Sequence, residues 1–572
     1  MPMCLNLSAV ELALRCPANV TATCCSYKKM RCRYFHRCGY QRQMPAGGEK
    51  VDVWIVASDT LFHPQEVFGE PAAVIIDEAI WRKGVRGVEE LGCSVPISSL
   101  LSPQPEVLDT TDSIAMRSFD RNWLGEALQK QAENGGVARQ VFAGLPTASC
   151  DRAIGLEWGC MPTIELQPGM VGADVRRLAR DSDRIDAIQH ARSIIKIWRA
   201  VRELIEREDI AVSGRLTLAQ RNGQRAVEWK GVAPISTRFR VPTLLLDATL
   251  PSKSILQMYH PHVEVAADIK VALPPHVHIR QILRAPTTAT KLIGKEKHLS
   301  ALRRYVLQRW METGRQQTLL VCQEKVEAWL AEKLPDSITV AHFQDIAGLD
   351  DYKGARLLIL AGRTQPGPEA VERLTAALTG AQPAVVAADP RGFAWYMQVE
   401  RGIRMADGRG IAVRGDQHPD AAAEGIRWQI CEAELIQALG RGRAINRTEV
   451  TPLDVDLLFD VCLPITVDAV ETWKRAEPSL LIETAVDGVM LTSPVDMVRV
   501  FPAIWSNRTK ADRTIRQGVP NLPGFKALTY QLAGERMKPR LAYFDASLIA
   551  DPQAWLEERL GKLKPFKEND AM

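Results

Sequence analysis

The sequence predicts an α/β protein built on doubly wound parallel sheets. Short continuous apolar runs recur along the chain, and such runs are typical of parallel strands that are covered on both faces. Several of these runs alternate with helix-like stretches, which is the order of a doubly wound sheet. Polar residues directly follow two of the runs, at the strand ends where open α/β sheets place their ligands.

Length and composition bound the class of protein. At 572 residues the chain is long enough for about three or four domains. A formal charge of +4 and a hydrophobic content of 46% exclude a disordered chain and a protein that coats a polyanion with its whole surface. No stretch approaches the ~18 uncharged apolar residues of a membrane span. Cys4, Glu11 and Arg15 lie where a signal peptide needs an apolar core, so we expect a cytoplasmic protein.

Apolar runs and helical spacing predict the order of the elements. A hairpin is expected around Asp407 and Gly408, and a long amphipathic helix over residues 182–208. The expected strands cover residues 51–56, 72–76, 241–247, 318–322, 356–361 and 383–388, and further helices are expected over 323–334, over 368–378 and within 433–447.

Cysteines are concentrated at the start of the chain, where six of the twelve lie within the first 38 residues. In a reducing compartment, clustered thiols indicate metal ligands before disulfides. Their spacing is wider than the tight hairpin of most structural zinc sites, which favours a [4Fe–4S] cluster and leaves Zn²⁺ as the alternative. Buried thiols without a metal are the plainer interpretation. The predicted ligands are Cys4, Cys25, Cys32 and Cys38, with Cys24 or Cys16 as substitutes.

Basic and aromatic residues are interleaved with these cysteines. Single-stranded nucleic acids bind basic groups through the backbone and aromatic rings through the bases, and this mixture supplies both. A solvated surface would have the same composition. The residues are Lys28, Lys29, Arg31, Arg33, Arg37 and Arg42, with Tyr27, Tyr34, Phe35 and Tyr40.

Acidic and hydroxyl groups follow two of the expected strands. Asp77 and Glu78 come directly after residues 72–76, and Asp247 and Thr249 end the run that begins at residue 241. In a nucleoside triphosphatase, an aspartate at such a strand end holds Mg²⁺ and a neighbouring glutamate orients the attacking water. Acidic residues also follow strands where the chain simply reaches solvent, so the pair does not decide the function alone.

A stretch rich in glycine and arginine ends the helix expected within residues 433–447. Arginine supplies planar, permanently charged donors for phosphate oxygens, and glycines allow close backbone approach. A solvated helix end stabilised by the helix dipole is the alternative. The residues singled out are Gln437, Gly440, Arg441, Arg443 and Arg447.

Taken in order, five motifs resemble the DinG-type and XPD-type iron–sulfur helicases of superfamily 2, most closely a mobile-element-associated branch. The motifs are C-x6-C-x-Y-F-x-x-C-G-Y-Q, VDVWIVASDTLF, VIIDEA, LLLDATL and QALGRGRAINR, and the likeness covers most of residues 4–450. It implies two RecA-like lobes that bind ATP and Mg²⁺ between them. It also implies an iron–sulfur domain and a helical arch inserted in the first lobe, with translocation along single-stranded or forked DNA.

The resemblance assigns roles only where residues match. Asp77 and Glu78 match the Walker B acidic pair, and Asp247 and Thr249 match the motif that couples hydrolysis to DNA. Gln437, Gly440 and Arg441 match the start of the arginine-finger motif, with Arg443 or Arg447 as its second arginine. Cys25, Cys32 and Cys38 match ligands of the cluster.

One motif of the family is not found in this sequence, namely the phosphate-binding loop G-x-x-x-x-G-K-[ST]. The backbone N–H groups and the lysine of that loop cradle the triphosphate. In the family the loop precedes the cysteines, so we expect an N-terminally truncated first lobe whose Walker A loop is supplied by an upstream polypeptide or by an earlier start of the chain.

The expected function is an ATP-dependent DNA helicase or translocase. The alternatives are a non-catalytic nucleic-acid-binding remnant and a zinc-stabilised interaction protein. The expected domains are a Cys-rich iron–sulfur segment (1–50), a partial first lobe (51–90 and 241–255), a helical arch-like insertion (91–240), a second lobe (256–450) and a C-terminal region of unassigned role (451–572).

Overall fold

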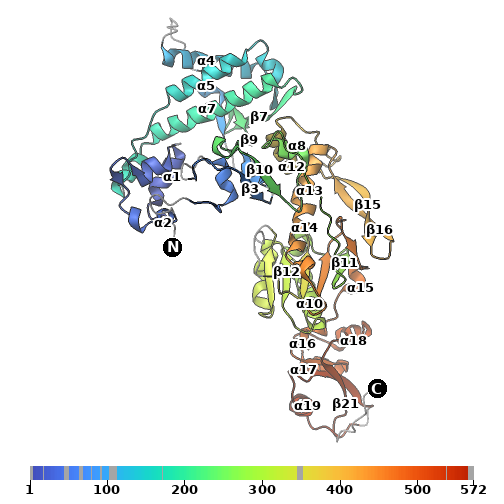
Figure 1. Ribbon diagram of the computed structural model, residues 1–572. Helices are drawn as coiled ribbons and strands as arrows, with labels where there is room; N and C mark the ends of the chain where they lie inside the picture. Colours follow the sequence, from blue (N-terminus) through green and yellow to red (C-terminus); the bar gives the residue numbers. More distant parts are fainter. Residues whose placement is uncertain are drawn as a thin grey trace. The chain divides into compact units, whose positions relative to one another are not determined.

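The computed structural model describes residues 4–16, 18–43, 51–63, 68–78, 80–89, 93–101, 112–170, 172–343, 352–535 and 538–564. The chain divides into two compact units (Figure 1). The first unit comprises Met1–Glu264, Gly367–Tyr396 and His418–Ile426, and the second comprises Val265–Pro366, Met397–Gln417 and Arg427–Met572. Across the described residues, no helix has both the length and the apolar character that crossing a membrane requires.

The second unit contains the doubly wound parallel sheet that the sequence predicts. Its six strands are all parallel, and β12 and β14 are buried along their whole length. In order across the sheet they are β13 (Ile338–His342), β12 (Thr318–Cys322), β14 (Leu357–Ala361), β17 (Leu453–Leu458), β11 (Val277–Leu283) and β19 (Ala469–Thr472).

Alternate residues of these strands enter two separate cores, one on each face of the sheet. Leu320 and Ile359 pack on one face with α10 (Glu296–Glu312) and α11 (Glu324–Leu330). Leu319 and Leu358 pack on the other face with residues of α14 (Glu432–Gly440). Side chains alternate across a strand, so a strand that is apolar at every position needs both covers.

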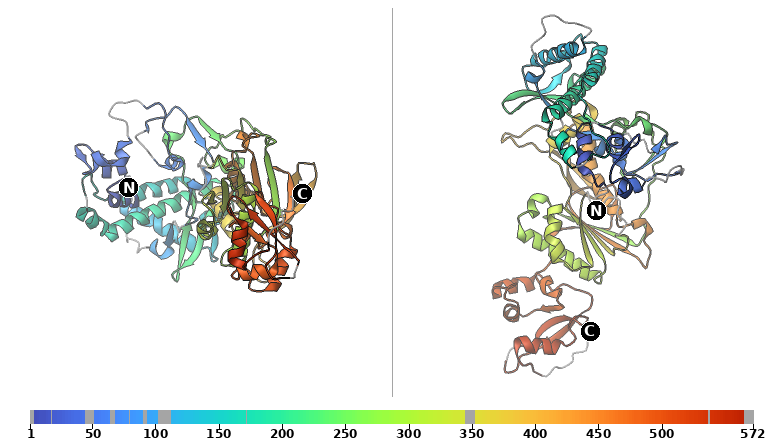
Figure 2. Two further views of the ribbon diagram at one scale, coloured as in Figure 1. Left: turned by 90° about the horizontal axis from the view of Figure 1, so that it is seen from below. Right: turned by 90° about the vertical axis from the view of Figure 1, so that its left-hand side faces the viewer.

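A smaller antiparallel sheet follows at the C-terminal end of the second unit (Figure 2). It consists of β20 (Val489–Leu491), β22 (Arg540–Asp545) and β21 (Phe525–Tyr530), with α17 (Pro494–Val500) and α19 (Pro552–Leu560) beside it. Met490 and Phe544 of this sheet, with Trp505 from the segment after α17, belong to the same hydrophobic core as α10 and one face of the six-stranded sheet.

The hairpin predicted around Gly408 is confirmed. Strands β15 (Met397–Met405) and β16 (Gly410–Gln417) pair antiparallel, and Gly408 takes a φ of 83° in the turn. A positive φ of this kind favours glycine because it has no Cβ.

In the first unit, the predicted long helix is α7 (Ser182–Glu206). The Asp181 carboxylate accepts a hydrogen bond from the Arg184 N–H at 3.2 Å and so caps the helix. The apolar side predicted for it is buried at Ile185, Ile188, Ile194, Ile195, Trp198 and Val201.

Around α7 the structure adds a sheet that the sequence analysis did not include. Helices α4 (Ser113–Gln129) and α5 (Thr147–Gly159) accompany four antiparallel strands in the order β5 (Ser94–Pro96), β8 (Gln224–Trp229), β7 (Val212–Arg221) and β6 (Gly135–Ala138). The segment expected to be helical therefore contains both kinds of structure.

Two predicted strands are wrong. Residues 51–56 form no strand, and Val53 and Ile55 are 76% and 95% exposed, because no neighbouring strand pairs with them among the described residues. Residues 383–388 form none either, since the N–H groups of Ala384 and Val386 donate to the carboxylates of Asp420 and Glu372 instead. Apolar composition alone does not supply a pairing partner.

Candidate functional site

The predicted acidic residues lie together at the end of a short parallel sheet in the first unit. Strand β3 (Val74–Asp77) pairs with β10 (Thr243–Leu246), and the register sets Asp77 opposite Leu246. The N–H of Glu78 donates to the carbonyl oxygen of Leu246 at 2.9 Å, so the pairing continues one residue past β3. Glu78 has a φ of 70°, which is uncommon for a residue other than glycine and occurs at functional sites more than elsewhere.

Glu78 and Asp247 line the same small cavity of about 10 Å³. The Asp247 Oδ1 atom accepts hydrogen bonds from the Thr249 N–H at 2.6 Å and from its hydroxyl at 3.1 Å. The other oxygen, Oδ2, is buried with no partner in the described part of the chain. Glu78 and Asp247 thus share a cavity whose other lining residues are mostly apolar, while Asp77 ends β3 beside it and is not among the lining residues.

His260 also lines this cavity, although the sequence predicts no role for it at this site. Its Nε2 atom is buried with no hydrogen-bond partner among the described residues, and burial lowers the pKa of the ring, which favours the neutral form. Two unsatisfied polar atoms in one cavity are unusual in a folded protein. The sequence offers no signal that would bring His260 to Asp247, because helix α8 (Lys253–Gln257) lies between them.

One face of the β3–β10 sheet is apolar and exposed, contrary to the expectation that both faces are covered. Ile75 is 70% exposed, and its register partner Leu244 is 50% exposed. Leu246, on the same face, is 49% exposed. The sheet has two strands within the described residues, and this face is largely open to solvent there.

The structure brings most of the predicted cysteine ligands together. A hairpin of β1 (Ser26–Tyr27) and β2 (Met30–Arg31) places Cys25 opposite Cys32, whose N–H donates to the Cys25 carbonyl at 2.8 Å. The pKa of Cys25 is raised to about 11, most of all by burial and then by the nearby Cys24, Cys4, Cys38 and Cys32.

The Cys4 thiol is part of the same group. Burial raises its pKa, and Cys38 adds to the rise both as a neighbouring charge and through a side-chain hydrogen bond. Cys16 differs: burial raises its pKa too, but its charged neighbours are Arg15 and Arg192 rather than thiols. Of the two substitutes, Cys24 therefore adjoins the group and Cys16 does not.

This thiol group has the donor chemistry of an iron–sulfur or zinc site. Thiolates are the ligands, and a bound cation reverses the mutual repulsion that raises these pKa values. Within the described residues, however, no three His, Cys, Asp or Glu side chains are arranged to hold a metal ion. The predicted set of four cysteine ligands therefore stays a prediction, and the proximity of the thiols is compatible with it.

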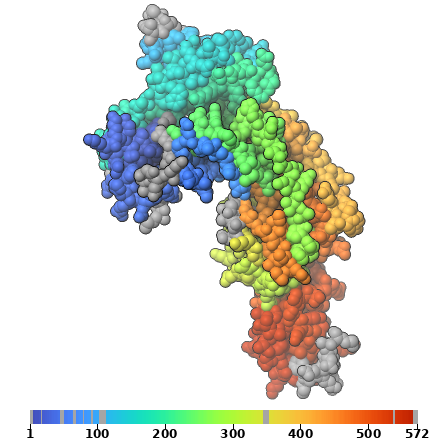
Figure 3. All heavy atoms as spheres, in the orientation of Figure 1, coloured from blue at the N-terminus to red at the C-terminus, as the bar shows by residue number. Residues whose placement is uncertain are grey.

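Basic and aromatic side chains of this segment contact one another at its surface, which Figure 3 shows in dark blue. Lys28 lies over the ring of Tyr27 at 5.3 Å, Arg31 over Phe35 at 5.1 Å, and Arg33 over Tyr34 at 4.9 Å from the ring centroid. Cation–π pairs orient both partners, so rings and charges are presented together.

The arginine-rich stretch ends helix α14 in the second unit. Gln437 and Gly440 lie in the helix, and the largely buried Arg441 is its C-terminal cap. Arg443 takes a left-handed φ of 47°. The Arg447 guanidinium donates to the Gly442 carbonyl oxygen at 2.6 and 2.9 Å, which closes the turn. The sequence predicts that these arginines contact Asp77 and Glu78. Such a contact would lie between the two units, and it stays a prediction.

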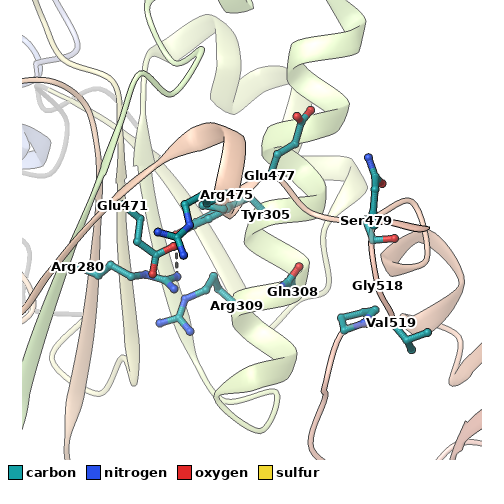
Figure 4. A pocket seen from close by; sticks show the side chains of 13 residues that line it. Arg280, Tyr305, Gln308, Arg309, Glu471, Arg475, Glu477, Ser479, Gly518 and Val519 are labelled. Carbon is teal, nitrogen blue, oxygen red and sulfur yellow. Dashed lines mark hydrogen bonds between the residues drawn. The ribbon is translucent and has the colours of Figure 1, made fainter. Parts of the chain in front are cut away.

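A larger cavity of about 260 Å³ contains none of the predicted site residues (Figure 4). Arg280, Arg309, Arg475 and Glu471 are among its lining residues. Arginines and glutamates face it together, so its charge favours no single class of ligand.

Behind that cavity lies a buried ion network. The fully buried Asp456 carboxylate accepts from Arg309 Nε at 2.7 Å, from Arg280 Nη2 at 3.2 Å and from the Tyr305 hydroxyl at 2.9 Å. Burial favours the neutral acid, but the two guanidinium groups outweigh it and lower the pKa of Asp456. The network links β11, α10 and β17 and is structural.

No family model matches the sequence, and no curated protein does. One solved structure, described as an XPD helicase, is similar over 68% of this chain with a TM-score of 0.28 and 9% sequence identity. The chain spans 64% of the length of that structure. A similarity this low carries no argument about residue roles, which depend on the geometry above.

Proposed function

We propose that this protein is the motor part of an ATP-dependent, iron–sulfur type DNA helicase or translocase that obtains its phosphate-binding loop from another polypeptide. The observation that carries the proposal is the site at the carboxyl ends of β3 and β10, where Glu78 and Asp247 line one cavity. Ligands of α/β sheets bind at this end of the strands.

Within that site, each acidic residue has a role that suits its position. Asp77, the last residue of β3, would hold Mg²⁺, and Glu78 would orient the water that attacks the γ-phosphate. The Asp247 carboxylate, hydrogen-bonded to Thr249, would transmit the state of the site to the DNA-binding segments. Arg441 and either Arg443 or Arg447 would neutralise phosphate charge.

The thiol group would hold a [4Fe–4S] cluster, with Zn²⁺ as the alternative, through Cys4, Cys25, Cys32 and Cys38. Support comes from the hairpin that sets Cys25 opposite Cys32 and from the hydrogen bond between Cys4 and Cys38. When bound, the metal would stabilise the fold of this short segment. Its cation–π pairs would then offer rings and charges to single-stranded DNA.

The exposed face of the β3–β10 sheet supports the requirement for a second polypeptide. Parallel sheets are covered on both faces, and a two-stranded sheet is marginal by itself. A strand-bearing polypeptide would cover Ile75, Leu244 and Leu246 and would bring a basic loop to the acidic strand ends. Asp247 Oδ2, buried and unsatisfied within the described residues, suits such a cation-bearing partner.

The docking test uses a photo-crosslinking residue at position 244 of the full chain in its native host. We expect a crosslink to one polypeptide that carries a phosphate-binding loop, and purified mixtures of the two should show slowed hydrogen exchange of β3 and β10. Leu244→Glu should abolish binding, whereas Ile114→Glu, at a similarly exposed site in α4, should not. A crosslink to a second copy of this chain, or none, would refute the docking.

The activity test combines the purified chain, that polypeptide, ATP and oligothymidylate. We expect ATP hydrolysis that rises at least about ten-fold when DNA is added, and no hydrolysis by either polypeptide alone. DNA binding without hydrolysis would instead identify a non-catalytic nucleic-acid-binding protein. Zinc in place of iron, with neither activity, would identify an interaction protein.

A further inference from the structure

We propose that Phe393 and Trp395 form a stacking platform for the bases of a single-stranded nucleic acid. Their rings are parallel to within 9° with centroids 6.1 Å apart. Phe393 is 63% exposed and Trp395 is 40% exposed, so both rings reach the solvent. Neither sequence motifs nor the predicted site included this segment, which precedes β15.

A buried tyrosine supports the two rings. Trp395 meets the ring of Tyr396 edge to face at a centroid distance of 5.4 Å. Tyr396 is 3% exposed and in turn contacts His418, whose ring centroid is 6.0 Å away. Because Tyr396 is anchored inside the first unit, the exposed rings are attached to a fixed point rather than to a loose loop.

A hydrogen-bonded turn fixes the other end of the platform. The Asp389 carboxylate accepts from the backbone N–H groups of Arg391 at 2.8 Å and of Phe393 at 3.0 Å. The Asp389 N–H donates to the Phe393 carbonyl at 2.9 Å, and the Gly392 N–H donates to the Asp389 carbonyl at 2.8 Å. These backbone bonds also lower the pKa of Asp389. Four hydrogen bonds therefore pre-organise two rings that remain exposed to solvent.

The chemistry of this surface favours bases over a protein partner. Aromatic faces stack with any base, and two exposed parallel rings offer two such positions close together. Arg391, 88% side-chain exposed at the turn, forms a surface ion pair with Asp389 at 3.1 Å. Such a pair contributes little and can be exchanged for a phosphate oxygen. Duplexes hide their base faces, so the ligand is single-stranded.

The platform rests on the proposed function only in the choice of DNA as the strand, because stacking requires neither ATP nor the second polypeptide. Its test is therefore run on the full chain alone, with fluorescein-labelled oligothymidylate and a duplex of equal length, by fluorescence anisotropy.

We expect Trp395→Ala and Phe393→Ala each to weaken oligothymidylate binding about ten-fold, with Trp395→Phe restoring most of it. Trp158→Ala removes a tryptophan of similar exposure, 47%, from α5 and should leave binding unchanged. Because Trp395 also contacts the buried Tyr396, thermal melting checks that each variant is folded at the assay temperature.

Three results would overturn the platform: no binding of oligothymidylate by the wild type, equal binding by Trp395→Ala, or an equal loss in Trp158→Ala. Tighter binding of the duplex than of the single strand would overturn it as well. Loss of ATP hydrolysis in the completed complex, with ring-dependent binding intact, would count against the proposed function alone.

Discussion

The N–H of Glu78 donates to the carbonyl oxygen of Leu246 at 2.9 Å, and this bond joins two segments that lie far apart in the sequence. It holds Glu78 in its left-handed conformation, with a φ of 70°, at the cavity it shares with Asp247. Backbone strain at a site persists where surrounding structure fixes it. The orientation of Glu78 is thus set by the sheet and not by its own preference.

Glu78→Gln should therefore abolish turnover in the complex with the loop-bearing polypeptide. Replacing the carboxylate removes the group that orients water, and such groups contribute about 10²–10⁴-fold. Nucleotide binding should persist, as measured by equilibrium binding of a labelled ATP analogue. Glu89→Gln, which alters an exposed ion pair with Arg82, is the matched control. Hydrolysis at the wild-type rate would remove Glu78 from the mechanism.

Cys32→Ser should lose bound iron, since a hydroxyl is a poor substitute for a thiolate ligand. Metal analysis and visible absorbance of protein purified without oxygen measure the loss. Cys16→Ser should keep the metal, because the charged neighbours of Cys16 are Arg15 and Arg192 rather than the other thiols. Equal iron content in both variants would contradict the ligand set.

Two glycines of the first unit should respond in opposite ways to alanine. A Cβ at Gly214 of β7 would meet the carbonyl oxygens of Ala376, at 2.7 Å, and of Ala381, and backbone cannot move aside cheaply. Gly155, inside α5, has open space around that position. Gly214→Ala should lower the free energy of unfolding by about 2 kcal/mol or more. Gly155→Ala should raise it by about 0.5–1 kcal/mol in denaturant titrations.

Asp456→Asn should destabilise the second unit by about 3 kcal/mol, because two guanidinium groups would stay in place without their carboxylate. The effect has a defined pH dependence. The pKa of Asp456 is lowered in the folded state, so its stabilisation is complete above the unfolded value of about 3.9 and is lost as pH falls through the folded value.

Unfolding measured in denaturant at several pH values checks this dependence. The difference between wild type and Asp456→Asn should be constant above about pH 5 and should shrink below about pH 4. A difference that grows in acid would mean that Asp456 is protonated in the folded protein.

Sequence reasoning succeeded where one local pattern determines the outcome. The runs at β12 and β14 were predictable because residues apolar at every position need cover on both faces. It failed at Ile55, whose neighbours look the same but have no pairing strand among the described residues, and at Ala384, whose N–H donates to a carboxylate. His260 could not be placed either, since its contact with the site depends on the turn after β10.

The shared core of the second unit changes how the last part of the chain should be regarded. Trp505, Phe544 and Leu556 pack in the same cluster as Leu320 and α10, although they follow the six-stranded sheet in sequence. The segment that follows β19 is thus part of the core of the second unit and cannot be removed without loss of packing. Truncation of the chain just after β19 would uncover one face of the six-stranded sheet. If the truncated protein failed to accumulate in cells, that result would carry no information about catalysis.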